Sequence, residues 1–214
     1  MRGATARERR RLTLRWGHRL FFACAALALG YCGFVLAEAR VFQYVESRNL
    51  DRQLHDEISL STISLPARLP ALPQDLPPLA TGRLIGRLEV SRLGLSVMVV
   101  EGEDQTTLRR AAGHVPSTSL PGEPGNVGIT GHRDTFFRPL RNIQLNDMIT
   151  LTTLQGEYRY RVVSTKVVTP ENVAVLDSTR GEILTLVTCH PFYFVGPAPK
   201  RFIVRAQRVP EAVT

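Results

Sequence analysis

The longest apolar segment of the chain is LFFACAALALGYCGFVLA, residues 20–37, which contains no charged residue. Its 18 residues lie at the lower end of the length that crosses a bilayer as a helix. Residues 1–19 carry seven arginines and one glutamate, and a basic segment on this side predicts a cytoplasmic N-terminus. We therefore expect a basic cytoplasmic segment at 1–19, a single transmembrane helix at 20–37, and an extracytoplasmic remainder.

Two other interpretations of the apolar segment stay open at this point. Ala37-Glu38-Ala39 is a small-x-small pattern of the kind cleaved behind signal peptides, although residues 20–37 are longer than the usual apolar region of such peptides. A buried core helix would have a similar composition. The transmembrane-helix and signal-peptide interpretations both place residues 40–214 outside the cytoplasm.

The next two segments differ sharply in pattern. Residues 38–60 mix apolar and charged positions at roughly helical spacing, which predicts a juxtamembrane helical stalk. Residues 61–81 form a proline-rich segment, with five prolines between Ser64 and Ala80. Proline at this density neither continues a helix nor enters a sheet interior, so we expect an extended linker.

From Gly82 onward the pattern changes to short runs rich in β-branched residues, several of which alternate apolar and polar positions. A helical patch at Gln105–Gly113 interrupts them, with the glycine as the expected stop. So many short strands in residues 82–210 favour a mainly β domain, a closed or nearly closed antiparallel barrel. The runs are RLIGRLEV, LSVMVV, NVGITGH, MITLTTL, YRYRVVSTKVV, ILTLVTC and RFIVRAQRV.

Charge and cysteine content narrow the function classes. The net charge is +8, but residues 1–19 account for +6 of it, so the β domain lacks the basic character expected of a nucleic-acid binder. Cys24 and Cys32 lie inside the apolar segment, where they are expected to be small apolar fillers. Cys189 is then alone in an exported domain, and an unpaired thiol in an oxidising compartment suggests a functional one.

Cys189 and His132 are suited to nucleophilic catalysis. A cysteine attacks as its thiolate, and a nearby imidazole can pair with the thiolate and later protonate a leaving amine. Cys189 ends one predicted strand and His132 follows another, so a rigid barrel could hold the two side chains together. Arg201 opens the next predicted strand, and an arginine there is a candidate to stabilise an oxyanion or hold a substrate backbone.

These residues lie in motifs that resemble those of sortases, the membrane-anchored cysteine transpeptidases of bacterial surfaces. TLVTC, ending at Cys189, matches the TLxTC signature, GHRD resembles the segment around the sortase histidine, and KRFIVRA resembles the strand that carries the sortase arginine. The motifs occur in the family's order, and the resemblance covers residues 82–210. The sequences of the motifs are most like those of class D-type sortases. His190, after the cysteine, stands where an aromatic residue is frequent.

The resemblance implies an eight-stranded sortase-type barrel with one or two short helices. It implies that Cys189 attacks the threonine carbonyl of an LPxTG-like C-terminal sorting signal on an exported protein, giving a thioacyl enzyme. His132 would protonate the leaving amine and deprotonate the incoming one, and Arg201 would stabilise the oxyanion or hold the signal. The amine acceptor would be a cell-wall peptide or a pilin lysine. No cofactor is implied.

Other polar residues near these motifs have simpler expected roles. Adjacent residues on a strand point to opposite faces, so His190 is expected to face away from the Cys189 side chain. Asp134 is expected to be a surface residue, and His114 a solvent-facing loop residue. We expect no metal site, because no CxxC or HxxxH spacing occurs and the acidic patch of Glu101, Glu103 and Asp104 is interpreted as a solvated loop.

Two rival functions remain. One is an L,D-transpeptidase-like enzyme of peptidoglycan, which also uses cysteine, histidine and arginine on a β-rich domain, but its SHGC-type motif is absent. The other is an anchored binding module that has lost catalysis, and the presence of Cys189, His132 and Arg201 argues against it.

Overall fold

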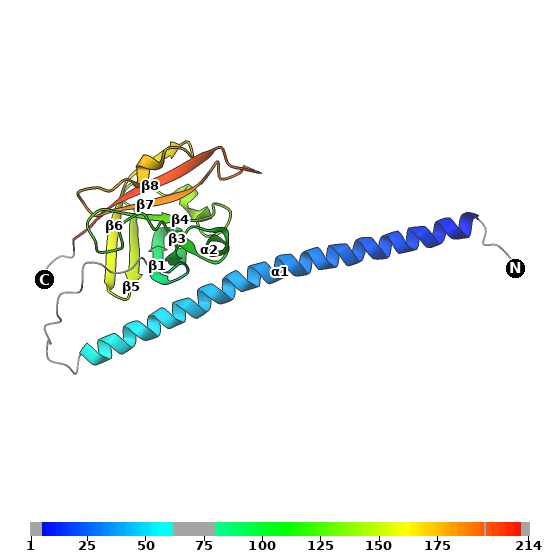
Figure 1. Ribbon diagram of the computed structural model, residues 1–214, viewed down its shortest axis with the longest axis horizontal. Helices are drawn as coiled ribbons and strands as arrows, with labels where there is room; N and C mark the ends of the chain where they lie inside the picture. The colour runs from blue at the N-terminus through cyan, green and yellow to red at the C-terminus, as the bar shows by residue number, and fades with distance from the viewer. Residues whose placement is uncertain (1–5, 62–79, 195, 211–214) are drawn as a thin grey trace. The chain divides into compact units, whose positions relative to one another are not determined.

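The computed structural model of the protein describes residues 6–61, 80–194 and 196–210 (Figure 1). The chain divides into two compact units, Met1–Val41 and Phe42–Thr214. Almost all of the predicted proline-rich linker, residues 61–81, lies outside the described residues.

One long helix, α1, runs from Ala6 to Ser61 and covers both the predicted transmembrane segment and the predicted stalk. Its large apolar side chains between Leu20 and Leu36 are exposed. Among the described residues it is the one helix long and apolar enough to cross a membrane, and none of its most apolar window is buried. A core helix would be covered by other side chains, so the exposure does not favour that interpretation.

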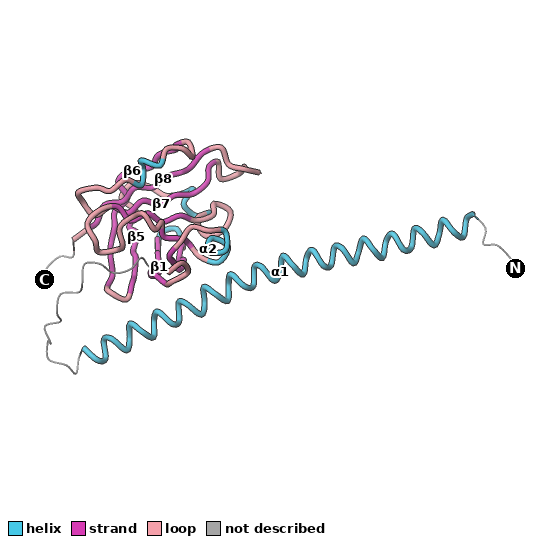
Figure 2. Tube along the Cα trace, viewed as in Figure 1, coloured by secondary structure: helices cyan, strands magenta, loops and turns pink. Residues whose placement is uncertain are grey.

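The second unit contains a closed barrel of eight strands, as predicted (Figures 1 and 2). The strand order around the barrel is β1-β2-β3-β4-β7-β8-β6-β5. The prediction of an antiparallel barrel was wrong at two pairs, β2–β3 and β4–β7, which are parallel; the other neighbours are antiparallel. Three short 3-10 helices, η1 (Ser91–Leu93), η2 (Arg138–Asn142) and η3 (Val173–Leu176), lie in its connections. The strands are β1 (Leu84–Val90), β2 (Leu95–Glu101), β3 (Ala112–His114), β4 (Asn126–Thr130), β5 (Met148–Thr153), β6 (Gly156–Val168), β7 (Ile183–His190) and β8 (Lys200–Arg208).

The predicted helical patch is shorter than expected and is followed by a strand. Helix α2 spans Gln105–Arg110, capped by the Asp104 side chain, and Gly113 lies in β3 rather than at a helix stop. A Cβ at Gly113 would lie 2.1 Å from the backbone oxygen of Gly102, so this position requires a glycine because another backbone segment approaches it closely. The prediction that Gly113 terminates the helix was wrong for this reason.

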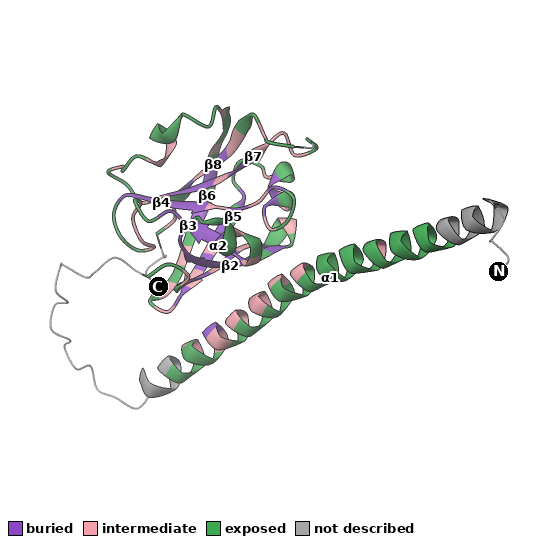
Figure 3. Ribbon diagram, turned by 45° about the vertical axis from the view of Figure 1, so that its right-hand side comes forward, coloured by how far each residue is buried: buried purple, intermediate pink, exposed green. Residues whose placement is uncertain are grey.

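Alternation along the strands separates a packed barrel interior from an outer face. On β7, Leu184 and Leu186 are fully buried in the core, and so are Val204 and Ala206 on the neighbouring β8. Buried residues follow the strands through the centre of the barrel (Figure 3). Because successive side chains on a strand point to opposite faces, Val187 and Cys189 lie on the outer face of β7.

The second unit also includes the end of α1, which contacts strands β1 and β2. The Gln43 side chain donates from Nε2 to the Arg110 carbonyl at 2.7 Å and accepts at Oε1 from the Met98 N–H at 2.8 Å. The Arg87 guanidinium pairs with Asp51 at 2.9 Å, and Leu50 is fully buried. This part of the predicted stalk is therefore packed as a component of the second unit.

Candidate active site

The register of β7 and β8 brings the candidate nucleophile and the candidate arginine together. Cys189 pairs directly with Arg201 across this antiparallel ladder. Both residues are half-buried, and both lie on the outer face, out of phase with the core residues Leu186 and Val204. Directly opposite residues in such a ladder have Cβ atoms about 4.5–5.5 Å apart, so the thiol and the guanidinium stem begin side by side.

His132 reaches the same region from the other side of β7. Strand β4 runs parallel to β7, with Thr130 opposite Val187. Beyond the last pair, the Gly131 N–H donates to the Val187 carbonyl at 3.1 Å and the Thr188 hydroxyl donates to the Gly131 carbonyl at 2.7 Å. These bonds continue the pairing of β4 with β7 one residue past Thr130, and His132 is the next residue, at the end of β4 that lies toward Cys189.

Arg201 is engaged by its own loop in this structure. Its Nη1 donates to the carbonyls of Ala198 and Lys200 at 3.2 and 3.1 Å. The Glu171 carboxyl lies within reach of its charge: hydrogen bonds from the Glu171 backbone N–H and the Thr169 side chain hold the pKa of Glu171 below its usual value, and Arg201 contributes a smaller lowering. The cation is therefore held at the rim of the site next to the β6–β7 connection.

A family model described as the Sortase domain matches residues 88–209, more than half of the chain. The chain belongs to the sortase family.

Individual sortases support the assignment. Sortase D of Bacillus subtilis (strain 168) is 36% identical over 130 residues, which is 60% of this chain and 66% of that protein. The solved structure of SrtA sortase from Actinomyces oris is 30% identical with a TM-score of 0.56, covering 65% of this chain and 87% of that one. A Clostridium perfringens Sortase D5 transpeptidase has a TM-score of 0.62 and covers 81% of this chain and 99% of that one; at 22% identity it shows the fold alone. The predicted resemblance to class D-type sortases is confirmed.

The second imidazole of this sortase, His190, lies on the side of β7 opposite to Cys189. Its ring stacks on Phe202 with centroids 6.2 Å apart and meets the edge of Phe192 at 6.0 Å. Its Nδ1 is buried and has no hydrogen-bond partner among the described residues. The alternation rule thus placed His190 correctly, and its ring packs with aromatic residues at the end of the barrel.

The predictions for Asp134 and His114 had contrasting outcomes. The Asp134 side chain is 70% exposed, with an oxygen 3.4 Å from the Arg133 Nε, so the predicted surface role is confirmed. The prediction of a solvent-facing His114 was wrong: its residue is 1% exposed, its Nδ1 lies 2.7 Å from Glu101 Oε2, and its Nε2 lies 3.0 Å from the Ser119 carbonyl. His114 belongs to β3, the strand that the sequence pattern missed, and Glu101 is buried with it rather than solvated.

Asn126, which sequence reasoning did not single out, fastens a loop to the outer face of β4. Its Nδ2 donates to the carbonyls of Val175 and Asp177 at 3.1 and 3.2 Å, and its Oδ1 accepts from the Thr185 hydroxyl at 2.7 Å. Asn126 and Thr185 are both buried. The signal in the sequence was a polar residue opening an otherwise apolar strand run.

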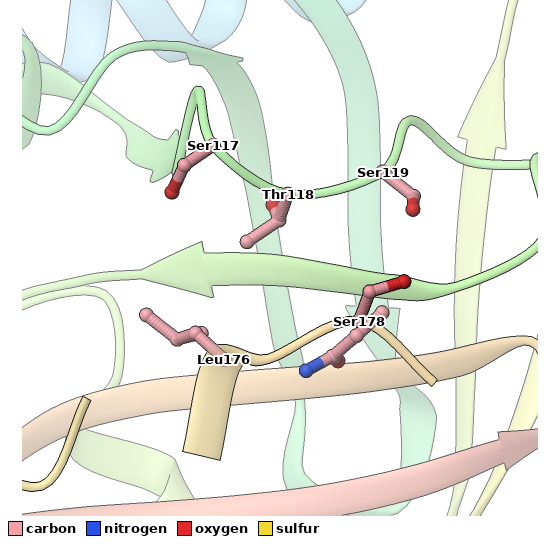
Figure 4. Close-up of a pocket in the computed structure, with 6 residues that line it drawn as sticks. Ser117, Thr118, Ser119, Leu176 and Ser178 are labelled. Atoms are coloured by element: carbon pink, nitrogen blue, oxygen red, sulfur yellow. The ribbon is translucent and has the colours of Figure 1, made fainter. Parts of the chain in front are cut away.

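A polar cavity of about 260 Å³ lies over this part of β4, between the β3–β4 and β6–β7 connections (Figure 4). A Cβ on Gly128 would lie 2.9 Å from Leu176 and 3.0 Å from Thr118, so the two connections approach the strand closely. The cavity is lined by Ser117, Thr118, Ser119, Asn126, Leu176 and Ser178. It lies at the start of β4, whereas His132 and Cys189 lie beyond its end and at the end of β7.

Within the described parts of the chain, no group of three or more histidine, cysteine or acidic side chains is arranged to hold a metal ion. The site therefore offers a thiol, an imidazole and a guanidinium at the ends of adjacent strands. That set suits acyl transfer: a nucleophile, a proton donor and acceptor, and a cation beside a developing oxyanion.

Proposed function

We propose that this sortase is a cysteine transpeptidase and that Cys189, His132 and Arg201 are its catalytic residues. One observation supports the proposal: Cys189 pairs with Arg201 across β7 and β8, and β4, which His132 follows, runs parallel to β7 toward the same end. Three residues that are distant in the sequence thus converge on one patch of the outer face, where a peptide can reach them.

In the proposed reaction, the Cys189 sulfur attacks the carbonyl carbon of the threonine in an LPxTG-like sorting signal. The peptide bond to the next residue breaks, and the leaving amine takes its proton from His132, which leaves a thioester on Cys189. An incoming amine then attacks the thioester and gives up a proton to His132. A new amide bond forms, the Cys189 sulfur leaves, and the starting state returns.

Arg201 has the electrostatic role in this scheme. When the carbonyl becomes tetrahedral, its oxygen carries negative charge, and a guanidinium directly across the ladder from Cys189 stabilises that charge or holds the signal's backbone. In the structure Nη1 is turned to the carbonyls of Ala198 and Lys200. Binding of substrate would require Arg201 to direct a donor toward the reacting carbonyl.

We further propose the location and partners that follow from the family. Residues 1–19 would lie in the cytoplasm, 20–37 would cross the membrane, and 38–60 and 61–81 would connect them to an extracytoplasmic catalytic domain at 82–210. The donors would be exported proteins with LPxTG-like C-terminal signals. The acceptors would be cell-wall peptides, which gives surface anchoring, or pilin lysines, which gives polymerisation.

The test is a peptide assay on the full chain in detergent. The protein is incubated with LPxTG-like and LAxTG-like peptides and a glycine amine, and mass spectrometry follows the products and any adduct on Cys189. We expect cleavage between threonine and glycine, an adduct that is absent in Cys189→Ala, and turnover that is strongly reduced in His132→Ala.

Two other outcomes would overturn the proposal in different directions. A reactive Cys189 thiol without any peptide adduct, together with an adduct on peptidoglycan fragments, would favour an L,D-transpeptidase-like activity. An inert thiol and no adduct with either donor would favour a non-catalytic binding module.

A further inference from the structure

Arg133, the residue after His132, is buried where a charged side chain is unusual. It is 6% exposed and lies in the connection that follows β4. Arginine is seldom this buried unless its donors are satisfied. Its nearest carboxylate, Asp134, is 3.4 Å from Nε and mostly exposed, which makes a weak pair.

The donors of Arg133 are instead satisfied by one loop. Nη1 donates to the Pro191 carbonyl at 2.8 Å, and Nη2 donates to the carbonyls of Phe194 and Gly196 at 2.6 and 3.1 Å. The guanidinium also lies 5.9 Å from the centre of the Phe194 ring. Three carbonyls on the connection between β7 and β8 therefore share a single cation.

This loop is the segment that joins the nucleophile to the arginine. Strand β7 ends at His190, directly after Cys189, and β8 begins at Lys200, directly before Arg201. Between them the backbone leaves the sheet, so ladder hydrogen bonds no longer fix its position. The bonds from Arg133 tie it to the segment that carries His132.

We propose that Arg133 is a positioning residue of the transpeptidase site: its guanidinium holds Pro191, Phe194 and Gly196 against the His132 segment and so keeps the imidazole in register with the Cys189 thiol. This inference rests on the function proposed above. Proton transfer requires the two groups within hydrogen-bond reach, and small misplacements of catalytic groups are costly.

Lysine cannot replace Arg133 in this arrangement. The planar guanidinium directs several N–H groups at fixed angles, and here two nitrogens reach three carbonyls spread along a loop. A lysine has one tetrahedral nitrogen and can satisfy only part of that set. Arg133→Lys therefore keeps the charge and removes the geometry, while Arg133→Met removes both.

Arg92 provides a control whose own contacts do not include His132 or the β7–β8 connection. It lies on η1, donates from Nη2 to the Asn142 carbonyl at 2.7 Å and pairs with Asp147, so it also fastens one connection to another. Arg92→Met removes a guanidinium that joins the β1–β2 connection to the far end of the β4–β5 connection, at Asn142 and Asp147, and leaves the contacts of Arg133 in place.

The test is a double-mutant cycle read by Cys189 alkylation with iodoacetamide at several pH values, on the full chain. His132→Ala is placed in the wild type, in Arg133→Met and in Arg92→Met. We expect Arg133→Met to slow alkylation about tenfold to a hundredfold, and His132→Ala to change it by less than about twofold further. In Arg92→Met, His132→Ala should have its full wild-type effect.

Peptide turnover and urea unfolding complete the experiment. We expect Arg133→Met and Arg133→Lys to lower kcat more than they raise KM, with Arg133→Lys intermediate or equally impaired. If Arg133→Met does not fold, the cycle is run with Arg133→Lys. If His132→Ala has its full effect in the Arg133 variants, the inference is overturned while wild-type turnover leaves the proposed function intact. If the wild type shows neither turnover nor a His132-dependent thiol, both fail.

Discussion

At each end of β4 a buried side chain binds the carbonyls of a loop, but one of these side chains is neutral and the other is charged. At its start, Asn126 uses a neutral amide to bind the carbonyls of Val175 and Asp177 and so fastens the β6–β7 connection. Beyond its end, Arg133 uses a cation to bind three carbonyls of the β7–β8 connection. In both cases one buried side chain satisfies loop carbonyls that no strand reaches.

We call Asn126 and Arg133 the two loop anchors, and the difference between them separates a role in stability from a role in catalysis. Removing a guanidinium from water costs more than removing an amide, so stability alone gives no reason for a cation at the second position. The Arg133 anchor is next to His132, whereas the Asn126 anchor lies at the start of the strand, beside the polar cavity. We expect changes at the end of β4 to alter reactivity and changes at its start to alter stability.

The largest expected effect is that of His132→Ala, which removes the proposed general acid and base beyond the end of β4. Loss of a general acid and base should lower kcat/KM about 10²–10⁴-fold. The free energy of unfolding should change little, because His132 is only half-buried. Peptide cleavage followed by chromatography and urea unfolding followed by circular dichroism measure the two quantities. Activity close to that of the wild type would show that His132 is not the proton donor.

A smaller effect is expected from a shortened protein that begins at Leu79 and thus lacks α1. It loses the cover of β1 and β2, including the fully buried Leu50, and the loss of that burial alone should lower the free energy of unfolding by about 1.5–3 kcal/mol. Alkylation of Cys189 should be unchanged, because these contacts involve β1, β2 and the Arg110 carbonyl rather than the segments of His132 or Cys189. The comparison is with a protein that begins at Ala37 and with Gln43→Ala in that protein. Equal urea midpoints for the two lengths would contradict the packing of α1 on the barrel.

Asn126→Ala should act on the start of β4 alone. Two loop carbonyls and the Thr185 hydroxyl would lose their partner, at a cost of about 1–3 kcal/mol in the free energy of unfolding. Ser117→Ala, which lines the same cavity, is the control and should have little effect. If Asn126→Ala instead slowed alkylation of Cys189 as strongly as Arg133→Met does, the contrast between the two ends would be wrong.

The smallest effect concerns pH, and it distinguishes the charged pair of Arg92 and Asp147 from the neutral contacts of Asn126. Hydrogen bonds from Arg92 hold the pKa of Asp147 below its usual value, against the opposing effect of burial. The ionised form is therefore favoured by folding, so its contribution is present above the unfolded pKa of about 3.9 and is lost as the pH falls through the lower folded value. The difference in urea midpoint between wild type and Asp147→Asn should narrow below about pH 4. The difference in urea midpoint between wild type and Asn126→Ala should not change with pH. If the Asp147→Asn difference were also independent of pH, the stabilising ion pair between Asp147 and Arg92 would be refuted.

The strands and the reactive residues could be predicted from the sequence, because β-branched runs and short motifs are local signals. Strand β3 could not, because three residues around Gly113 are too few to show alternation and the glycine looks like a helix stop. The anchors were also missed. Arg133 binds carbonyls about sixty residues away, and Asn126 binds carbonyls about fifty residues away. Such partners are set by the closure of the barrel, and nothing in the local pattern around either residue specifies them.

The Gln43 side chain also completes the hydrogen bonding of the barrel backbone. Strand β3 begins opposite Val99, so the Met98 N–H and the Arg110 carbonyl lie just outside the β2–β3 ladder, and the Gln43 amide binds both in the manner of a peptide group. Without it, this donor and this acceptor would lack a protein partner at a point where β2 has not yet met β3, and unpaired backbone groups are costly when they are buried. The end of α1 thus completes backbone hydrogen bonding that the strands of the barrel leave unmade, as well as covering its surface.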